Sequence, residues 1–233
     1  MKQKVLCMAA LLGIAVCGSA QKQNTLSKKE KKEGWELLFN GKDLDGWKFF
    51  KGGEVNKGWH VTDRIMNNSG IGSDHGGDII TTRQFEDFEL YLEWRIGPES
   101  NSGVFYRVQE DDDRGITDAP EYQLIDDKGW PSKLDPGQYS GANYAMHPPQ
   151  GGEVKPLDQW NTTRIVVRGS KVQHYLNGEK VVEYELWSDD WIERKNNCKW
   201  KDKPLYGMAK KGHIGLQDHG GLTQFRNIKI REL

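Results

Sequence analysis

Carboxylates, an arginine and an amide recur on one face of several segments that alternate between apolar and polar residues. Such side chains hydrogen-bond sugar hydroxyls, and aromatic rings stack on the faces of sugars. One interpretation of these faces is therefore a groove that binds carbohydrate. The other is a solvent-exposed sheet surface that carries cross-strand ion pairs. The alternating polar sets are Glu89, Tyr91, Glu93 and Arg95; Phe105 and Arg107; and Glu121 and Gln123.

Other kinds of chemistry find weaker support in the sequence. The acidic run 110–113 lacks the spaced ligands and the glycine of an EF-hand loop. His213 and His219 lack the spacing of helical zinc sites. No Gly-x-Ser-x-Gly elbow, P-loop or Gly-x-Gly-x-x-Gly motif occurs, which disfavours a serine hydrolase, an NTPase and a dinucleotide enzyme.

The elements that must position these side chains are short strands. Period-2 alternation or β-branched composition predicts strands over 88–96, 103–108, 121–125, 163–168, 172–176, 179–184, 213–217 and 225–230. Asn177-Gly178 predicts a tight hairpin between two of them. One short helix is expected within 189–199. Because no helical segments alternate with the strands, the pattern predicts an all-β antiparallel sandwich.

The first twenty residues have the pattern of a secretory signal peptide. Lys2 and Lys4 precede a short apolar run, and Gly18-Ser19-Ala20 suits cleavage after Ala20. We therefore expect an exported protein, periplasmic or secreted; lipidation at Cys17 is the less favoured alternative. Residues 21–33 are charged and nearly free of apolar side chains, so we expect a flexible tether there. The folded domain is predicted over 34–233.

Charge and cysteine content restrict the partners. The 33 basic and 34 acidic residues give a net charge of −1, which disfavours a nucleic-acid binder. No segment is apolar for the roughly 20 residues that a membrane span needs. Cleavage removes Cys7 and Cys17, and Cys198 alone can form neither an internal disulfide nor a thiolate metal site.

Six segments together resemble the 3-keto-disaccharide hydrolase domain family, formerly the domain of unknown function 1080. The resemblance covers about residues 34–233 in order, and its closing motif is specific. The segments are Leu38-Phe39-Asn40-Gly41-Lys42-Asp43-Leu44-Asp45-Gly46-Trp47, Gly77-Asp78-Ile79-Ile80-Thr81-Thr82, Asn101-Ser102-Gly103-Val104-Phe105-Tyr106-Arg107, Glu121-Tyr122-Gln123-Leu124-Ile125-Asp126, Trp160-Asn161, and Gly212-His213-Ile214-Gly215-Leu216-Gln217-Asp218-His219-Gly220 leading into Phe225-Arg226-Asn227-Ile228-Lys229-Ile230.

The resemblance implies a concanavalin A-like jelly roll of two curved antiparallel sheets with a carbohydrate groove. It also implies an exported bacterial protein, of a kind common in Bacteroidetes, that acts on glycosides already oxidised at C3 by a partner oxidoreductase. A ketone at C3 acidifies the C2 proton, so a base can remove that proton and the C1 substituent leaves by β-elimination. Water then adds to the enone. This route needs a base, an acid, and positive charge or hydrogen-bond donors near the enolate.

The resemblance and the strand faces together select the candidate site residues. Glu121 and His219 are the expected acid/base pair, and Arg107 is expected to hold the enolate oxygen. Asn101, Gln123, Gln217, Asp218 and His75 are expected to bind the substrate, with Tyr144 or Trp160 stacking on a sugar. A divalent cation would suit enolisation, but no ligand set is evident. The alternatives are a non-catalytic carbohydrate-binding module and an interaction domain of a glycan-uptake complex.

Overall fold

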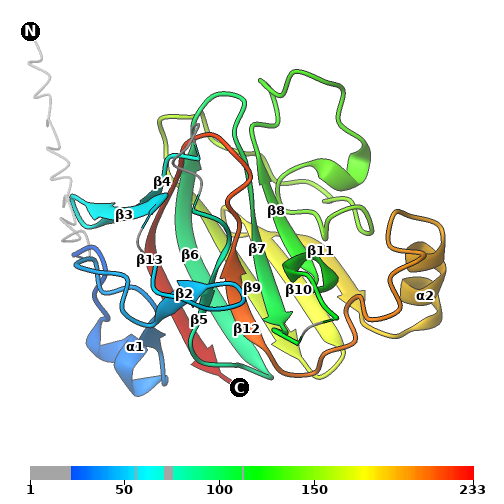
Figure 1. Cartoon of the computed structure of the whole chain (residues 1–233), viewed down its shortest axis with the longest axis horizontal. Coiled ribbons are helices and arrows are strands. Elements are labelled where there is room, and N and C mark those ends of the chain that lie inside the picture. Colours follow the sequence, from blue (N-terminus) through cyan, green and yellow to red (C-terminus); the bar gives the residue numbers. More distant parts are fainter. Residues whose placement is uncertain (1–21, 56, 71–75, 112) are drawn as a thin grey trace, which may run out of the picture.

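Two antiparallel β-sheets lie face to face in the computed structural model, which describes residues 22–55, 57–70, 76–111 and 113–233. The elements of the described residues, most of which are labelled in Figure 1, follow in chain order. They are α1 (Lys28–Lys32), β1 (Glu36–Leu37), β2 (Trp47–Phe49), β3 (Trp59–Thr62), β4 (Ile65–Asn68), β5 (Ile79–Thr81), β6 (Phe88–Ile96), β7 (Asn101–Val108), η2 (Ile116–Asp118), β8 (Glu121–Ile125), η3 (Pro136–Gln138), β9 (Asn161–Arg168), β10 (Lys171–Leu176), β11 (Glu179–Glu185), α2 (Asp189–Asn196), β12 (His213–Leu216) and β13 (Thr223–Glu232).

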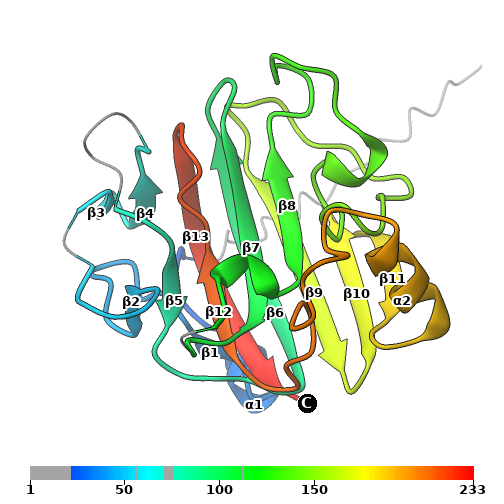
Figure 2. The same cartoon turned by 45° about the vertical axis from the view of Figure 1, so that its right-hand side comes forward.

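Within the described residues, the larger sheet has eight strands and the smaller has five. The order in the larger sheet is β11-β10-β9-β6-β13-β4-β3, with β1 also paired to β13. The order in the smaller sheet is β2-β5-β12-β7-β8. Figure 2 shows β12, β7 and β8 in front of β13, β6 and β9. The chain thus forms the concanavalin A-like jelly roll that the sequence predicted.

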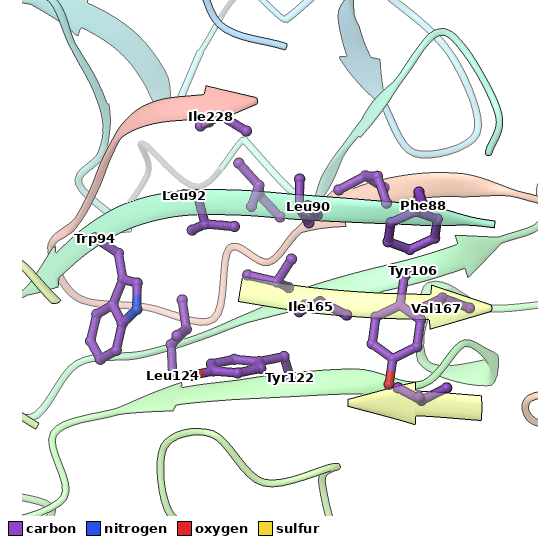
Figure 3. Close-up of a cluster of buried hydrophobic side chains, with 14 of the residues drawn as sticks. Phe88, Leu90, Leu92, Trp94, Tyr106, Tyr122, Leu124, Ile165, Val167 and Ile228 are labelled. Carbon is purple, nitrogen blue, oxygen red and sulfur yellow. The ribbon is translucent and has the colours of Figure 1, made fainter. Parts of the chain in front are cut away.

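Apolar side chains from both sheets fill the space between them. Figure 3 shows side chains of β6, β9 and β13 meeting those of β7 and β8, as alternation places every second residue inward. Leu90, Trp94 and Ile165 come from the larger sheet, and Tyr122 and Leu124 from the smaller; each is at most 1% exposed. Residues 121 and 123 must therefore point away from this core, out of the smaller sheet.

The predicted strands are confirmed, most of them within one or two residues of their ends. Asn177 and Gly178 both have positive φ, as the predicted hairpin between β10 and β11 requires. The predicted helix is α2: the Ser188 side chain accepts a hydrogen bond from the Trp191 backbone at its start, and Trp191 is buried. In the described part of the chain, neither helix has the length and apolar character to cross a bilayer.

The expected flexible tether is wrong for residues 22–33. Asn24 is only 3% exposed and exchanges two hydrogen bonds with Asn227, of 2.6 and 2.7 Å. Ser27 and Glu30 form a capping box that starts α1, and Glu30 also pairs with Lys229 of β13. A segment whose one apolar residue is Leu26 is thus held by polar contacts, which composition does not reveal.

Candidate functional site

Glu121 and Gln123 lie on the outer face of the five-stranded sheet. β8 is not an open edge, because residues 141–144 run alongside it: Tyr144 N donates to the Glu121 carbonyl at 3.0 Å, and Gln123 N donates to the Ala142 carbonyl at 3.1 Å. The Glu121 side chain lies across Gly103 of the neighbouring strand β7. A Cβ on Gly103 would come within 2.1 Å of Glu121 Oε1, so glycine is required beneath this carboxyl group.

The Glu121 carboxyl group is a buried acid. The residue is 4% exposed, and burial raises its pKa from 4.5 to about 8. The positive charge of Lys199 opposes this rise, and the negative charge of Asp78 adds to it. At neutral pH the group therefore holds its proton, as a general acid must.

Asp78 is the second carboxyl group at this site. Burial raises its pKa from 3.8 to about 6, although Asp218 N donates to its Oδ1 at 2.8 Å. The charge of Asp218 raises this pKa further and that of His219 lowers it. Asp218 Oδ2 in turn accepts the backbone N–H groups of Gly76 and Gly77, at 2.9 and 3.0 Å. The loops before β5 and after β12 are thereby joined.

A chain of amide contacts connects Glu121 to the exposed imidazole of His219. Asn101 Nδ2 lies 3.4 Å from His219 Nδ1. The Gln123 amide lies between Asn101 and Glu121: its nitrogen donates to Asn101 Oδ1 at 3.4 Å or, with the amide turned over, to Glu121 Oε1 at 3.1 Å. The structure therefore brings Glu121, Gln123, Asn101, Asp218 and His219 together.

Arg107 does not belong to this group, and its predicted role is wrong. It has a φ of +59° in a β-bulge, where Tyr106 and Arg107 together oppose Ile214 of β12. Its guanidinium donates to the carbonyls of Glu86 and Gly169, at 2.9 and 3.0 Å, and the residue is 2% exposed. The prediction put Arg107 on the same face as Phe105, because residues of a regular strand alternate between its two faces. The bulge interrupts that alternation. Arg107 links the two sheets instead.

The polar face of β6 also lies elsewhere, on the outer face of the eight-stranded sheet. There Glu89 accepts from Arg164 and Arg231, and Glu93 accepts from Arg226 and Asn227. These are the cross-strand ion pairs of the alternative interpretation. Trp160 lies on the same side, with Arg226 and Arg95 over its ring at 4.1 and 4.9 Å. It is therefore not placed to stack on a sugar bound at Glu121.

The remaining predicted residues have mixed outcomes. Tyr144 is half-buried beside Glu121, and Gln217 N donates to the Gly103 carbonyl at 3.0 Å. His75 lies outside the described residues. Within the described ranges, no three His, Cys, Asp or Glu side chains are grouped so that they could hold a metal ion.

Sequence reasoning missed two residues of this site. Asp78 stands in a segment that carried the family resemblance, and its position directly before a buried strand was the available signal. Lys199 lies at the end of the range predicted to hold the helix, follows α2 in the structure and has no motif around it. Its Nζ lies over the rings of Tyr144 and Trp200, at 4.7 and 4.8 Å.

A jelly-roll sandwich that gathers two carboxyl groups of raised pKa and an exposed imidazole on one sheet face is the framework of an acid–base enzyme. The chain belongs to the family described as the 3-keto-alpha-glucoside-1,2-lyase-like domain, whose model matches residues 34–231. It is 34% identical over 229 residues to a 3-keto-disaccharide hydrolase of Bacteroides thetaiotaomicron, with 86% of this chain and 79% of that protein covered. These relationships identify a glycoside-cleaving enzyme of the hydrolase class.

Solved structures agree with the fold. The crystal structure of a provisionally assigned glycosyl hydrolase from Parabacteroides distasonis is 39% identical and superposes with a TM-score of 0.85, covering 91% of this chain and all of that one. A second such structure from the same organism is 30% identical with a TM-score of 0.67, covering 85% of this chain and 99% of that one.

Proposed function

We propose that this enzyme cleaves glycosides whose sugar ring already carries a ketone at C3, by elimination followed by hydration. The names of the family and of the Bacteroides relative support this substrate class. The observation that carries the proposal is the pair of groups on one sheet face: a buried Glu121 with a pKa of about 8, and an exposed His219 held beside Asn101.

Each step has a group to perform it. His219 removes the proton from C2, and the electron pair of the C2–H bond moves toward the C3 carbonyl, giving an enolate. When the enolate collapses, the bond between C1 and the leaving oxygen breaks, and protonated Glu121 gives its proton to that oxygen. Water then adds its oxygen to C1 and a proton returns to C2. The net reaction is hydrolysis. Because no oxocarbenium ion forms, the enzyme does not need two carboxylates at the fixed separation found in ordinary glycosidases.

The substrate defines the preceding reaction. A C3 ketone must be made by an oxidoreductase that removes hydride from the C3 carbon of the glycoside, and we propose such an enzyme as the pathway partner. The N-terminal sequence pattern supports export, to the periplasm or beyond. Amino-terminal sequencing of the protein recovered from its native cell fraction would test the cut after Ala20; recovery of an uncut cytoplasmic chain would contradict it.

The test of the chemistry uses oxidised and unoxidised substrates side by side. Purified protein is incubated with 3-keto-trehalose and with trehalose in D₂O, and glucose release is measured. We expect release from the keto sugar alone, with deuterium at C2 of the 3-keto-glucose product. Equal cleavage of trehalose would overturn the need for oxidation. Release without deuterium at C2 would contradict elimination. Binding without turnover of either sugar would indicate a carbohydrate-binding module.

A further inference from the structure

The proposed elimination places negative charge on the C3 oxygen, and a cation beside that oxygen would stabilise it. Arg107, whose guanidinium is enclosed between the sheets, cannot reach the outer face of β8. The charges that act on the Glu121 carboxyl group are those of Lys199 and Asp78. Lys199 is thus the positive charge that the described part of the chain brings to this acid.

The Lys199 ammonium is held by two aromatic rings. Its Nζ lies 4.7 Å from the ring centre of Tyr144 and 4.8 Å from that of Trp200, in cation–π contact with both. Trp200 is 5% exposed and stacks on Tyr206 at 4.6 Å, which itself stacks on Trp191 of α2 at 6.1 Å. The position of the charge is therefore supported by a buried aromatic row, although the lysine itself is exposed.

The same rings are tied to the backbone of Glu121. Tyr144 N donates to the Glu121 carbonyl at 3.0 Å, and Trp200 Nε1 donates to the Tyr144 carbonyl at 3.3 Å. These two hydrogen bonds connect the Tyr144 backbone and the Trp200 indole to the strand that carries the acid, and the ammonium lies over the rings of these two residues.

We propose that Lys199 is the enolate-binding group of this site, an inference that rests on the proposed function. As the base takes the C2 proton and the C2–H electron pair shifts, the C3 carbonyl oxygen becomes an enolate oxygen beside the ammonium. When the C1–O bond breaks, the charge returns from that oxygen and the neutral enone forms. Lys199 keeps its proton throughout and interacts more strongly with the charged intermediate than with the ketone.

The test compares Lys199→Met with Lys210→Met, which removes another exposed lysine that lies over a tryptophan, Trp187, at 5.9 Å. We expect Lys199→Met to lower kcat on 3-keto-trehalose by about 10²–10³-fold with a smaller change in KM, as for loss of an oxyanion donor. Lys210→Met should keep full activity. Lys199→Arg should restore part of kcat, because the charge returns on a side chain of similar length.

Two further measurements separate this inference from the proposed function. Because Lys199 opposes the rise in the Glu121 pKa, its removal should move the alkaline limb of the pH–rate profile to higher pH. The rate of C2–H exchange in D₂O for 3-keto-1,5-anhydroglucitol, which has no leaving group at C1, should fall by the same factor as kcat.

A wild-type protein without activity on any keto sugar would refute the function itself. An active wild type with unchanged kcat and exchange in Lys199→Met would refute only the role of Lys199.

Discussion

The two outer faces of the sandwich carry the same kinds of residue but differ in how charge is compensated. On the eight-stranded sheet, Glu89 lies between Arg164 and Arg231, and Glu93 is bound by Arg226. On the five-stranded sheet, Glu121 lies against a glycine, and the cation that acts on it is held by aromatic rings. Burial without an arginine partner therefore produces an acid that keeps its proton near neutral pH.

The difference shows that a carboxylate acquires its role from its partners. A paired carboxylate stays ionised and stabilises the sheet, whereas a desolvated one can give and take a proton. Removing a carboxylate from the five-stranded sheet should thus lower activity. Removing one from the eight-stranded sheet should lower stability and leave activity unchanged.

The largest effect is expected for Glu121→Gln. Loss of the acid should reduce kcat/KM on 3-keto-trehalose by about 10³-fold, within the range for general acid–base groups, while the circular dichroism spectrum stays unchanged. Glu93→Gln, on the other face, is the matched control and should keep at least half of the activity. Equal losses in the two variants would mean that the faces do not differ as we describe.

The next effect concerns stability against pH. The folded Glu121 has a pKa of about 8, above its ordinary value of 4.5, so the folded state binds this proton more tightly than the unfolded state. The resulting stabilisation is full below pH 4.5 and is lost as the pH rises through 8. Between pH 5 and 9, wild type should lose about 4 kcal/mol relative to Glu121→Gln.

Urea denaturation of both proteins at each pH measures this difference. Groups that the two proteins share, such as the buried His174, whose pKa burial lowers to about 3, cancel in the comparison. Parallel stability curves for the two proteins would show that Glu121 titrates alike in the folded and unfolded states.

The smallest effect is expected for Glu89→Leu, which should alter stability alone. It leaves Arg164 and Arg231 without their carboxylate, but both arginine side chains are about a third exposed and can turn to water. We therefore expect a loss of about 1–3 kcal/mol in the free energy of unfolding, with unchanged kcat/KM.

Glu183→Gln, at an exposed pair with Lys180, serves as the control and should leave the urea midpoint unchanged. A drop in activity in Glu89→Leu would tie this face to the site.

The sequence predicted the strands and the fold, because alternation determines which residues share a face, whereas Asn101, Asp218 and His219 were selected through the family resemblance. It did not predict the direction of Arg107, since a single positive φ in a bulge reverses the alternation. It also could not show which carboxylates would be paired, because Arg231 is 142 residues from Glu89 and meets it only through the sheet. Lys199 was missed for the same reason: its contact with Tyr144 joins residues that are separated along the chain by β9, β10, β11 and α2.

The contact between Asn24 and Asn227 has a practical consequence for anyone who prepares this enzyme. Similarity to the family begins at residue 34, yet the folded unit begins earlier, where Asn24 also donates to the Arg64 carbonyl at 2.7 Å. A recombinant version trimmed to the similarity boundary would strip hydrogen bonds from the last strand and leave Lys229 without Glu30. Expression should start no later than Lys22, because the region of sequence similarity to the family is shorter than the region that folds as one unit in this protein.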